Sequence, residues 1–212
     1  MSATVLICAV SACSGDNDSA EEPSLTASQV CDSTLDSSAS TALQRVGNVA
    51  KFTELPGTND SGEPNTFSLK RSASTIHEDQ TQRNQCVVFK AGDKTGHPLI
   101  AVDFSAEKYA TTPDPSAEDD DSALYSMGVY AKSNGNSSAI LYFKCPTQGT
   151  EEPKNSTPYI KASLTSAGQL SIKTTGRDLM AILNAVSRGL AKQLGCTSEA
   201  ALPAQVPEAK VG

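Results

Sequence analysis

The sequence predicts an α+β domain in which a mainly antiparallel sheet packs on N-terminal and C-terminal helices and two disulfides hold the layers together. Amphipathic stripes with helical spacing occur near both ends of the chain, which favours helices there. Short apolar runs bounded by turn residues lie between the stripes and favour strands. Four widely separated cysteines complete the pattern. With 212 residues, the chain is long enough for one domain of this kind and a tether.

Residues 1–12 have the features of an export signal. Ala3 to Ala12 is an apolar stretch of the length of a secretory core, about 7–15 residues, and is shorter than the roughly 20 residues of a membrane span. Val10-Ser11-Ala12-Cys13 resembles the bacterial lipobox, whose cysteine carries lipid, so we predict lipidation of Cys13 and a membrane partner through that lipid. Because no positive charge precedes Cys13, a plain cleaved secretion signal and a chance cysteine remain the alternatives.

Residues 13–30 are predicted to be a flexible acidic tether, because Ser, Asp, Glu and Ala dominate and offer little to bury. Asp16, Asp18, Glu21 and Glu22 lie in this segment, so the domain itself is closer to neutral than the net charge of -7 suggests. A nucleic-acid-binding surface requires a basic footprint that releases counterions from phosphates. The composition shows none, so we expect no nucleic-acid partner.

Four cysteines remain in the predicted domain, residues 31–198: Cys31, Cys86, Cys145 and Cys196. An even number in a chain with export features indicates two disulfides formed in an oxidising compartment. Four cysteines allow three connectivities, and we favour Cys31–Cys86 with Cys145–Cys196, because each bridge would join a helix-bearing segment to a nearby strand. The wide spacing lacks the C-x₂-C pairs typical of zinc sites.

The first half of the domain contains several predicted elements in order. A helix capped by Asp36 or Ser37 runs to Gly47, where glycine favours a helix end. A short strand within Val49–Leu55, a loop at 56–65 and a helix from Phe67 to about Gln80 follow. Strands are predicted at Cys86–Phe89 and Leu99–Phe104, and an acidic loop at 113–121.

The second half begins with a predicted hairpin, Leu124–Lys132 and Ser138–Cys145, around a two-residue Asn134-Gly135 turn of type I′. In that register Tyr130 would face Ala139. A strand at Pro158–Leu164 follows, with a partner strand at Gln169–Lys173. A strongly amphipathic helix is predicted from Asp178 to Leu194, and residues 199–212 are expected to be a flexible tail.

The residues that could carry chemistry are few. His77 and His97 are the only histidines, no nucleophile-elbow, phosphate-loop or dinucleotide motif occurs, and the acidic run Glu118–Asp121 is typical of a solvated loop. We therefore assign no catalytic residue, no metal site and no cofactor. The hairpin tyrosines Tyr125, Tyr130 and Tyr142 are candidates for a ligand groove, although such residues more often belong to the core or a half-exposed sheet.

The segments Cys31-Asp32-Ser33-Thr34-Leu35 and Leu190-Ala191-Lys192-Gln193-Leu194-Gly195-Cys196, with the spacing of the four domain cysteines, resemble those of uncharacterised secreted lipoproteins of actinobacteria, particularly streptomycetes. The resemblance implies a cell-envelope location and brings no established activity. We expect a lipoprotein on the extracellular face of the cell membrane, with a non-catalytic domain that binds a small molecule or a protein. An extracellular hydrolase of unfamiliar type and a structural accessory subunit of an envelope complex are the alternatives.

Overall fold

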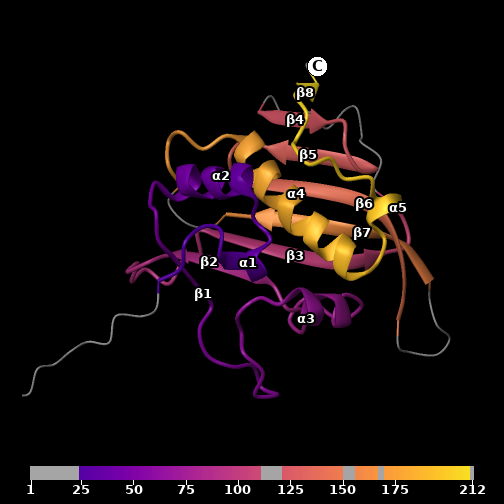
Figure 1. The fold of residues 1–212 in the computed structure, drawn as a ribbon, viewed down its shortest axis with the longest axis horizontal. Coiled ribbons are helices and arrows are strands. Elements are labelled where there is room, and N and C mark those ends of the chain that lie inside the picture. The colour runs from indigo at the N-terminus through magenta and orange to yellow at the C-terminus, as the bar shows by residue number, and fades with distance from the viewer. Residues whose placement is uncertain (1–23, 111–120, 150–155, 167–169, 211–212) are drawn as a thin grey trace, which may run out of the picture.

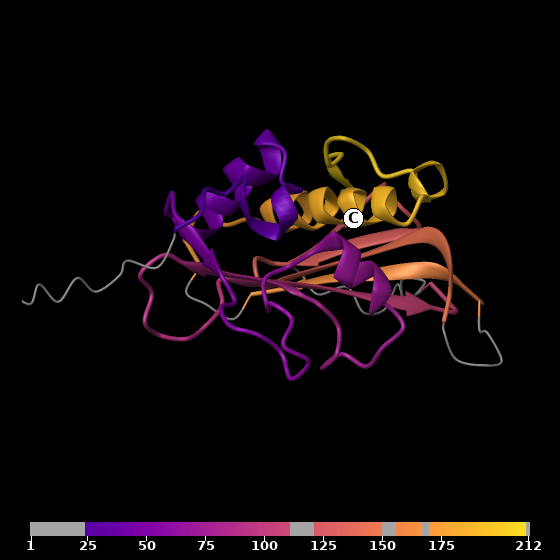
Figure 2. The ribbon, with the colours of Figure 1, turned by 60° about the horizontal axis from the view of Figure 1, so that its bottom comes forward.

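The computed structural model describes residues 24–110, 121–149, 156–166 and 170–210. They form one eight-stranded antiparallel sheet with helices on one of its sides (Figures 1 and 2), so the predicted α+β class is confirmed. The predicted signal, Cys13 and most of the acidic loop lie outside the described residues.

The strands follow the spatial order β1-β2-β3-β7-β6-β5-β4-β8, and every neighbouring pair is antiparallel. The long strands β3, β7 and β6 occupy the centre, and the two-residue strand β8 lies at one edge (Figure 1). Their bounds are β1 Phe52–Glu54, β2 Cys86–Lys90, β3 Ile100–Glu107, β4 Ser122–Tyr125, β5 Tyr130–Asn134, β6 Ser138–Gln148, β7 Ser156–Thr165 and β8 Ala209–Lys210.

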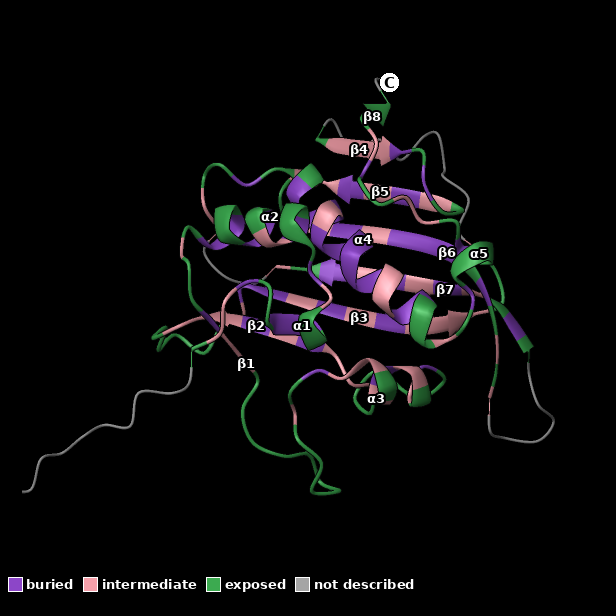
Figure 3. Ribbon diagram, in the orientation of Figure 1, coloured by how far each residue is buried: buried purple, intermediate pink, exposed green. Residues whose placement is uncertain are grey.

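Alternation along each strand separates the two faces of the sheet. On β6, Leu141, Phe143 and Cys145 are fully buried, and Cys145 is bonded to a cysteine of the helix layer, so this set of positions faces the helices. Successive side chains of a strand point to opposite faces, and the intervening positions therefore face away from the helices. Figure 3 shows the resulting alternation of buried and intermediate residues along β3 and β7. On β6, Tyr142 faces away from the helices and is nevertheless buried.

The helix layer is built mainly from α4, Gly176–Gln193, which packs over the centre of the sheet. Its predicted stripe is buried at Leu179, Ile182, Leu183, Val186 and Leu190, and each such side chain contributes about 1.5–3 kcal/mol on burial. α2, Ser37–Gly47, lies beside α4 and begins at Asp36, whose carboxylate accepts the Ser38 and Ala39 N–H groups, as predicted. No helix in the described part of the chain has the length and apolar character needed to cross a membrane.

Both favoured disulfides are confirmed. Cys31–Cys86 joins α1, Val30–Ser33, to β2, and Cys145–Cys196 joins β6 to the start of α5, Thr197–Ala200. The Cα atoms are 5.4 and 5.3 Å apart, within the usual range for a bridge. Each bridge therefore links the helix layer to the sheet.

The predicted hairpin register is wrong. Tyr130 pairs with Tyr142 rather than Ala139, and the loop contains three residues, 135–137, because Asn134 pairs with Ser138. A type I′ turn requires positive φ at both central residues, which were predicted to be Asn134 and Gly135, but of these two only Gly135 has it, at 51°. The Gly135 N–H donates instead to the carbonyl of Asp121, the residue before β4, so the turn is also held by the neighbouring segment.

The predicted strand at 124–132 is in fact two strands, β4 and β5, which pair with each other. The chain reverses at Gly128, where φ is 58°. A Cβ at this position would lie 2.4 Å from the Tyr142 carbonyl oxygen, so only glycine allows this close approach.

Two other predicted elements differ from the structure. The helix after Phe67 is the six-residue α3, Leu69–Ser74, because frequent Ser and Thr residues compete with helical hydrogen bonds. The partner strand at 169–173 is absent from residues 170–173, where the Ser171 N–H donates to the Val46 carbonyl. β7 has no free edge for such a partner, since β3 and β6 already pair with its two sides.

The folded domain extends beyond the predicted limits of 31 and 198. At its start, Leu25 pairs with Phe52, and Ala27 and Val30 are buried. At its end, residues 199–210, expected to be flexible, cross α4 and finish as β8 against β4. Apolar side chains on both segments, including Val206, bury themselves on the domain, which explains their order.

Candidate functional site

The face of the sheet that points away from the helices carries a repeated pattern of tyrosine and lysine. Three adjacent strands each contain a Tyr-x-Lys triplet: Tyr130-Ala131-Lys132 on β5, Tyr142-Phe143-Lys144 on β6 and Tyr159-Ile160-Lys161 on β7. In each triplet the middle residue is buried against the helices, so the tyrosine and lysine both point to the other side. We call these six residues the tyrosine–lysine face.

The register places the members of the tyrosine–lysine face next to one another across the strands. Tyr142 is opposite Tyr130 on one side and opposite Lys161 on the other, while Lys144 is opposite Tyr159. Opposite residues of an antiparallel pair have Cβ atoms about 4.5–5.5 Å apart. A ring is therefore opposite an ammonium group in two pairs between β6 and β7, whereas Lys132 on β5 is opposite Ile140.

The two tyrosine rings at the β5 side of this face are in contact. The centroids of Tyr130 and Tyr142 are 6.2 Å apart, and their planes are inclined by 49°, which is a favourable tilted geometry. Burial, and then the neighbouring Tyr142, raise the pKa of Tyr130 above 10.0. The Tyr130 hydroxyl therefore stays protonated at neutral pH and can donate a hydrogen bond.

The third predicted tyrosine lies on the opposite side of the sheet. Tyr125 is buried, and its hydroxyl is 3.2 Å from the Ser133 hydroxyl, on the helix side. The structure thus brings Tyr130 and Tyr142 together and separates Tyr125 from them. The three predicted tyrosines do not line one groove.

Among the described residues, two acidic side chains of β3, the strand next to β7, point to the same side of the sheet and accept hydrogen bonds. Asp103 accepts hydrogen bonds from Nε and Nη2 of Arg83 at 3.0 and 2.6 Å. Glu107 accepts the Ser105 hydroxyl at 2.8 Å. Arg83 belongs to the segment after α3, so this segment reaches the β3 end of the face.

A polar cleft of about 700 Å³ lies near β1 and β2, between the loop at 56–65 and the segment at 78–85. Val87 forms part of its wall, and the alternation of β2 directs this side chain away from the helices. Its charged walls carry both signs, with Asp60, Glu63 and Glu78 beside two arginines. The cleft therefore does not favour one ligand charge.

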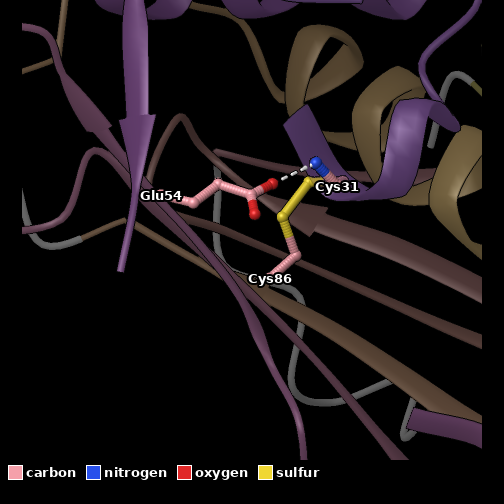
Figure 4. Close-up of side chains that lie close together, drawn as sticks. All are labelled: Cys31, Glu54 and Cys86. Carbon is pink, nitrogen blue, oxygen red and sulfur yellow. Dashed lines mark hydrogen bonds between the residues drawn. A yellow bond between two sulfur atoms is a disulfide. The ribbon is translucent and has the colours of Figure 1, made fainter. Parts of the chain in front are cut away.

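Cys31, Cys86 and Glu54 form the one group in the described residues whose ligand atoms, all within 4.8 Å, could suit a metal ion (Figure 4). The two sulfur atoms are joined in a disulfide and so offer no thiolate, the form that binds metal. The Glu54 carboxylate accepts the Cys31 N–H at 2.5 Å and the Phe67 N–H at 3.1 Å. Its oxygens thus serve backbone groups, and the cluster is structural.

Both histidines are exposed, and they lie in different segments of the chain. His77 is next to Gly149, and partial burial lowers the pKa of its imidazole. His97 is exposed in the loop between β2 and β3, where its N–H donates to the Thr95 hydroxyl. No hydrogen bond or ion pair between either imidazole and a carboxylate is present among the described residues.

Sequence reasoning missed Tyr159 and all three lysines of the face. The signal was present as the repeated Tyr-x-Lys spacing, since residues two apart on a strand share a face. It could not be read as one surface, because the adjacency of β5, β6 and β7 depends on strand order. The predicted lipidation site Cys13 lies outside the described residues.

Comparison with protein-family models, with curated proteins and with solved structures finds no match for this chain.

Proposed function

We propose that this protein is a cell-envelope lipoprotein whose extracellular domain binds a ligand without catalysis, through the tyrosine–lysine face. The two disulfides support a non-cytoplasmic location. The lipobox-like sequence at Cys13 supports attachment to the outer side of the membrane.

The observation that carries the proposal is the repeat of Tyr-x-Lys on three adjacent strands. On a protein with a net charge of -7, Lys144 and Lys161 on adjacent strands of one face make a local positive region that attracts anions. Tyr142 is only 7% exposed, whereas Tyr130 and Tyr159 are half-buried. The rings of Tyr130 and Tyr159 therefore offer flat apolar surfaces with a polar edge, suited to sugar rings. The ligand class that fits both is an extended acidic polysaccharide of the envelope.

The chemistry of the face also supports binding rather than catalysis. Hydrolysis of a glycosidic bond uses two carboxyl groups, one as acid and one as base or nucleophile. On the neighbouring strand β3, Asp103 is committed to Arg83 and Glu107 to Ser105. The six residues of the face supply hydroxyl and ammonium groups and no carboxyl group.

The direct test is calorimetric titration of the full chain with polygalacturonate, an acidic polysaccharide, and with dextran, a neutral one. We expect the protein to bind polygalacturonate, to bind it more weakly as salt increases, and to bind dextran at least tenfold more weakly. Salt dependence is expected because screening weakens contacts between exposed charges.

Substitutions locate the binding surface. We expect Lys161→Gln to weaken binding about fivefold, the loss of roughly one exposed charge contact, and Tyr159→Ala to weaken it about as much through the lost ring contact. Lys192→Gln, on the exposed side of α4, is the matched control and should bind like wild type. Equal affinity for both polymers, or equal losses in Lys161→Gln and Lys192→Gln, would refute the proposal, as would tighter binding of single-stranded DNA.

A further inference from the structure

Residues 202–210, Leu-Pro-Ala-Gln-Val-Pro-Glu-Ala-Lys, cross the outer side of α4 as an extended segment that we call the strap (Figures 1 and 2). The strap leaves α5, passes over α4 and ends as β8 on the edge strand β4. It contains no helix, and its pairing with β4 involves only two of its residues, Ala209 and Lys210.

Side chains of α4 donate hydrogen bonds to backbone carbonyl groups of the strap. Nδ2 of Asn184 donates to the Pro203 carbonyl at 2.9 Å. Nη1 of Arg188 donates to the Ala204 carbonyl at 3.2 Å, and Nη2 of Arg177 donates to the Val206 carbonyl at 2.8 Å. Positions 177, 184 and 188 are spaced by seven and four residues, so they share one side of the helix.

Two side chains of the strap add selectivity to these backbone contacts. Val206 is 7% exposed and belongs to the hydrophobic core. Glu208 forms an ion pair with Arg177. The surface of α4 therefore selects an extended segment with a small apolar residue followed, two positions later, by a carboxylate.

The strap begins directly after a strained residue. Ala201 has φ 48° and ψ 37°, a left-handed conformation that disfavours residues with a Cβ atom. The preceding chain is fixed, because Cys196 is bonded to Cys145 on β6. Ala201 is therefore the hinge between the disulfide-bonded Cys196 and the strap. If the hinge became extended, the strain at Ala201 would be released.

We propose that the strap exchanges between two copies of this chain, so that α4 of each copy receives the strap of the other in a two-fold symmetric dimer. Every contact of the closed form would be made again between copies. The second copy is the occupant that the structure supports, because its strap supplies the same carbonyls, Val206 and Glu208 that α4 is shown to hold. This inference does not depend on the tyrosine–lysine face.

Disulfide trapping tests the exchange directly. In the full chain, with Cys8 and Cys13 replaced by Ser in every variant, Arg188→Cys is mixed with Ala204→Cys and oxidised. These positions are in contact across the strap, since Arg188 donates to the Ala204 carbonyl. We expect a covalent heterodimer whose yield rises with protein concentration, because exchange requires two molecules.

Two controls make each outcome decisive. The double variant Arg188→Cys/Ala204→Cys should close within one chain at any concentration, which shows that the cysteines can bond. Arg188→Cys mixed with Asp60→Cys, in the exposed loop near β1, should give only background dimer. If the double variant closes internally while the mixed pair never exceeds that background, the strap does not exchange and the proposal fails.

The hinge gives a second, independent readout. Glycine accepts the left-handed conformation of residue 201 without the Cβ penalty, so Ala201→Gly removes the strain that favours opening. We expect this variant to lower the equilibrium yield of exchanged dimer about fivefold for each hinge, as roughly 1 kcal/mol of relieved strain implies. An unchanged or increased dimer yield would contradict the role of the hinge.

Discussion

Arg45 of α2 donates from Nε and Nη2 to Oδ1 of Asp178 in α4, at 3.1 and 2.5 Å, across 133 positions of sequence. The other carboxylate oxygen, Oδ2, accepts the Thr175 N–H at 3.0 Å and so completes the capping box of α4. Asp178 therefore stabilises the start of the longest helix and also fastens it to α2. The two ends of the domain meet at this carboxylate.

Removing the Asp178 carboxylate should destabilise the domain. We expect Asp178→Ala to lower the free energy of unfolding by about 2–4 kcal/mol, the loss of a helix cap and of a largely buried acceptor for a charged donor. The Arg45 side chain is 50% exposed, so its freed charge can be hydrated, which keeps the loss below that of a fully buried pair. Urea denaturation measures it, and Asp178→Asn, which keeps one cap acceptor, should lose less than the alanine variant.

The Cys145–Cys196 disulfide should contribute strongly to stability, because it closes a long loop between the sheet and the end of α4. Its cysteines are 51 positions apart, for which the chain-entropy relation gives about 4 kcal/mol. We expect the double variant Cys145→Ala/Cys196→Ala to lose about that much in guanidinium denaturation. A loss below about 1 kcal/mol would show that the helix layer holds this corner without the bridge.

Gly176, the first residue of α4, lies against the hairpin between β5 and β6. A Cβ at this position would be 2.3 Å from the Ser133 hydroxyl oxygen and 2.7 Å from the Gly135 carbonyl oxygen. We expect Gly176→Ala to lower the unfolding free energy by about 1–3 kcal/mol through overpacking, although alanine is the better helix former. The matched control is Gly149→Ala, where the nearest atom is 3.7 Å away; equal thermal shifts in the two variants would contradict the steric argument.

Much of this fold could be predicted from the sequence, because the responsible patterns are local. The stripe of α4 and the Asp36 cap of α2 each lie within one element, and both are observed. The disulfide pairing could be predicted because each bridge joins a helix-bearing segment to a strand, and the sequence pattern indicated which segments were helical and which were strands. The order of strands and the pairing of edges depend on distant segments, and the predicted strand at 169–173 failed for that reason.

The hairpin shows how a strong local signal can be overruled. Asn134-Gly135 favours a two-residue turn, but the Gly135 N–H bonds to the Asp121 carbonyl and lengthens the loop. The resulting register pairs Tyr130 with Tyr142. The tyrosine–lysine face depends on that pairing. The three triplets can be seen in the sequence, but their position side by side in the sheet could not be predicted from it.

The carboxyl group of Glu54 should make stability depend on pH. Burial raises its pKa above the ordinary value of 4.5, against the lowering effect of hydrogen bonds from the Cys31 and Phe67 N–H groups. A raised pKa in the folded state means that the folded protein binds the proton more tightly than the unfolded chain. Proton binding by Glu54 therefore stabilises the folded state, and this stabilisation is fully present below pH 4.5 and is lost as pH rises through the folded-state pKa.

Glu54→Gln tests this dependence, because glutamine keeps the shape of the side chain and cannot ionise. The absolute stability of the variant also changes, because its amide group meets a backbone N–H that the carboxylate accepted. The informative quantity is therefore how the difference in stability between variant and wild type changes with pH. We expect thermal denaturation between pH 4 and 7.5 to show this difference shifting in favour of the variant as pH rises. Glu63→Gln, in the exposed loop, should follow wild type throughout, and parallel profiles for Glu54→Gln and wild type would show that the buried carboxyl group does not titrate differently on folding.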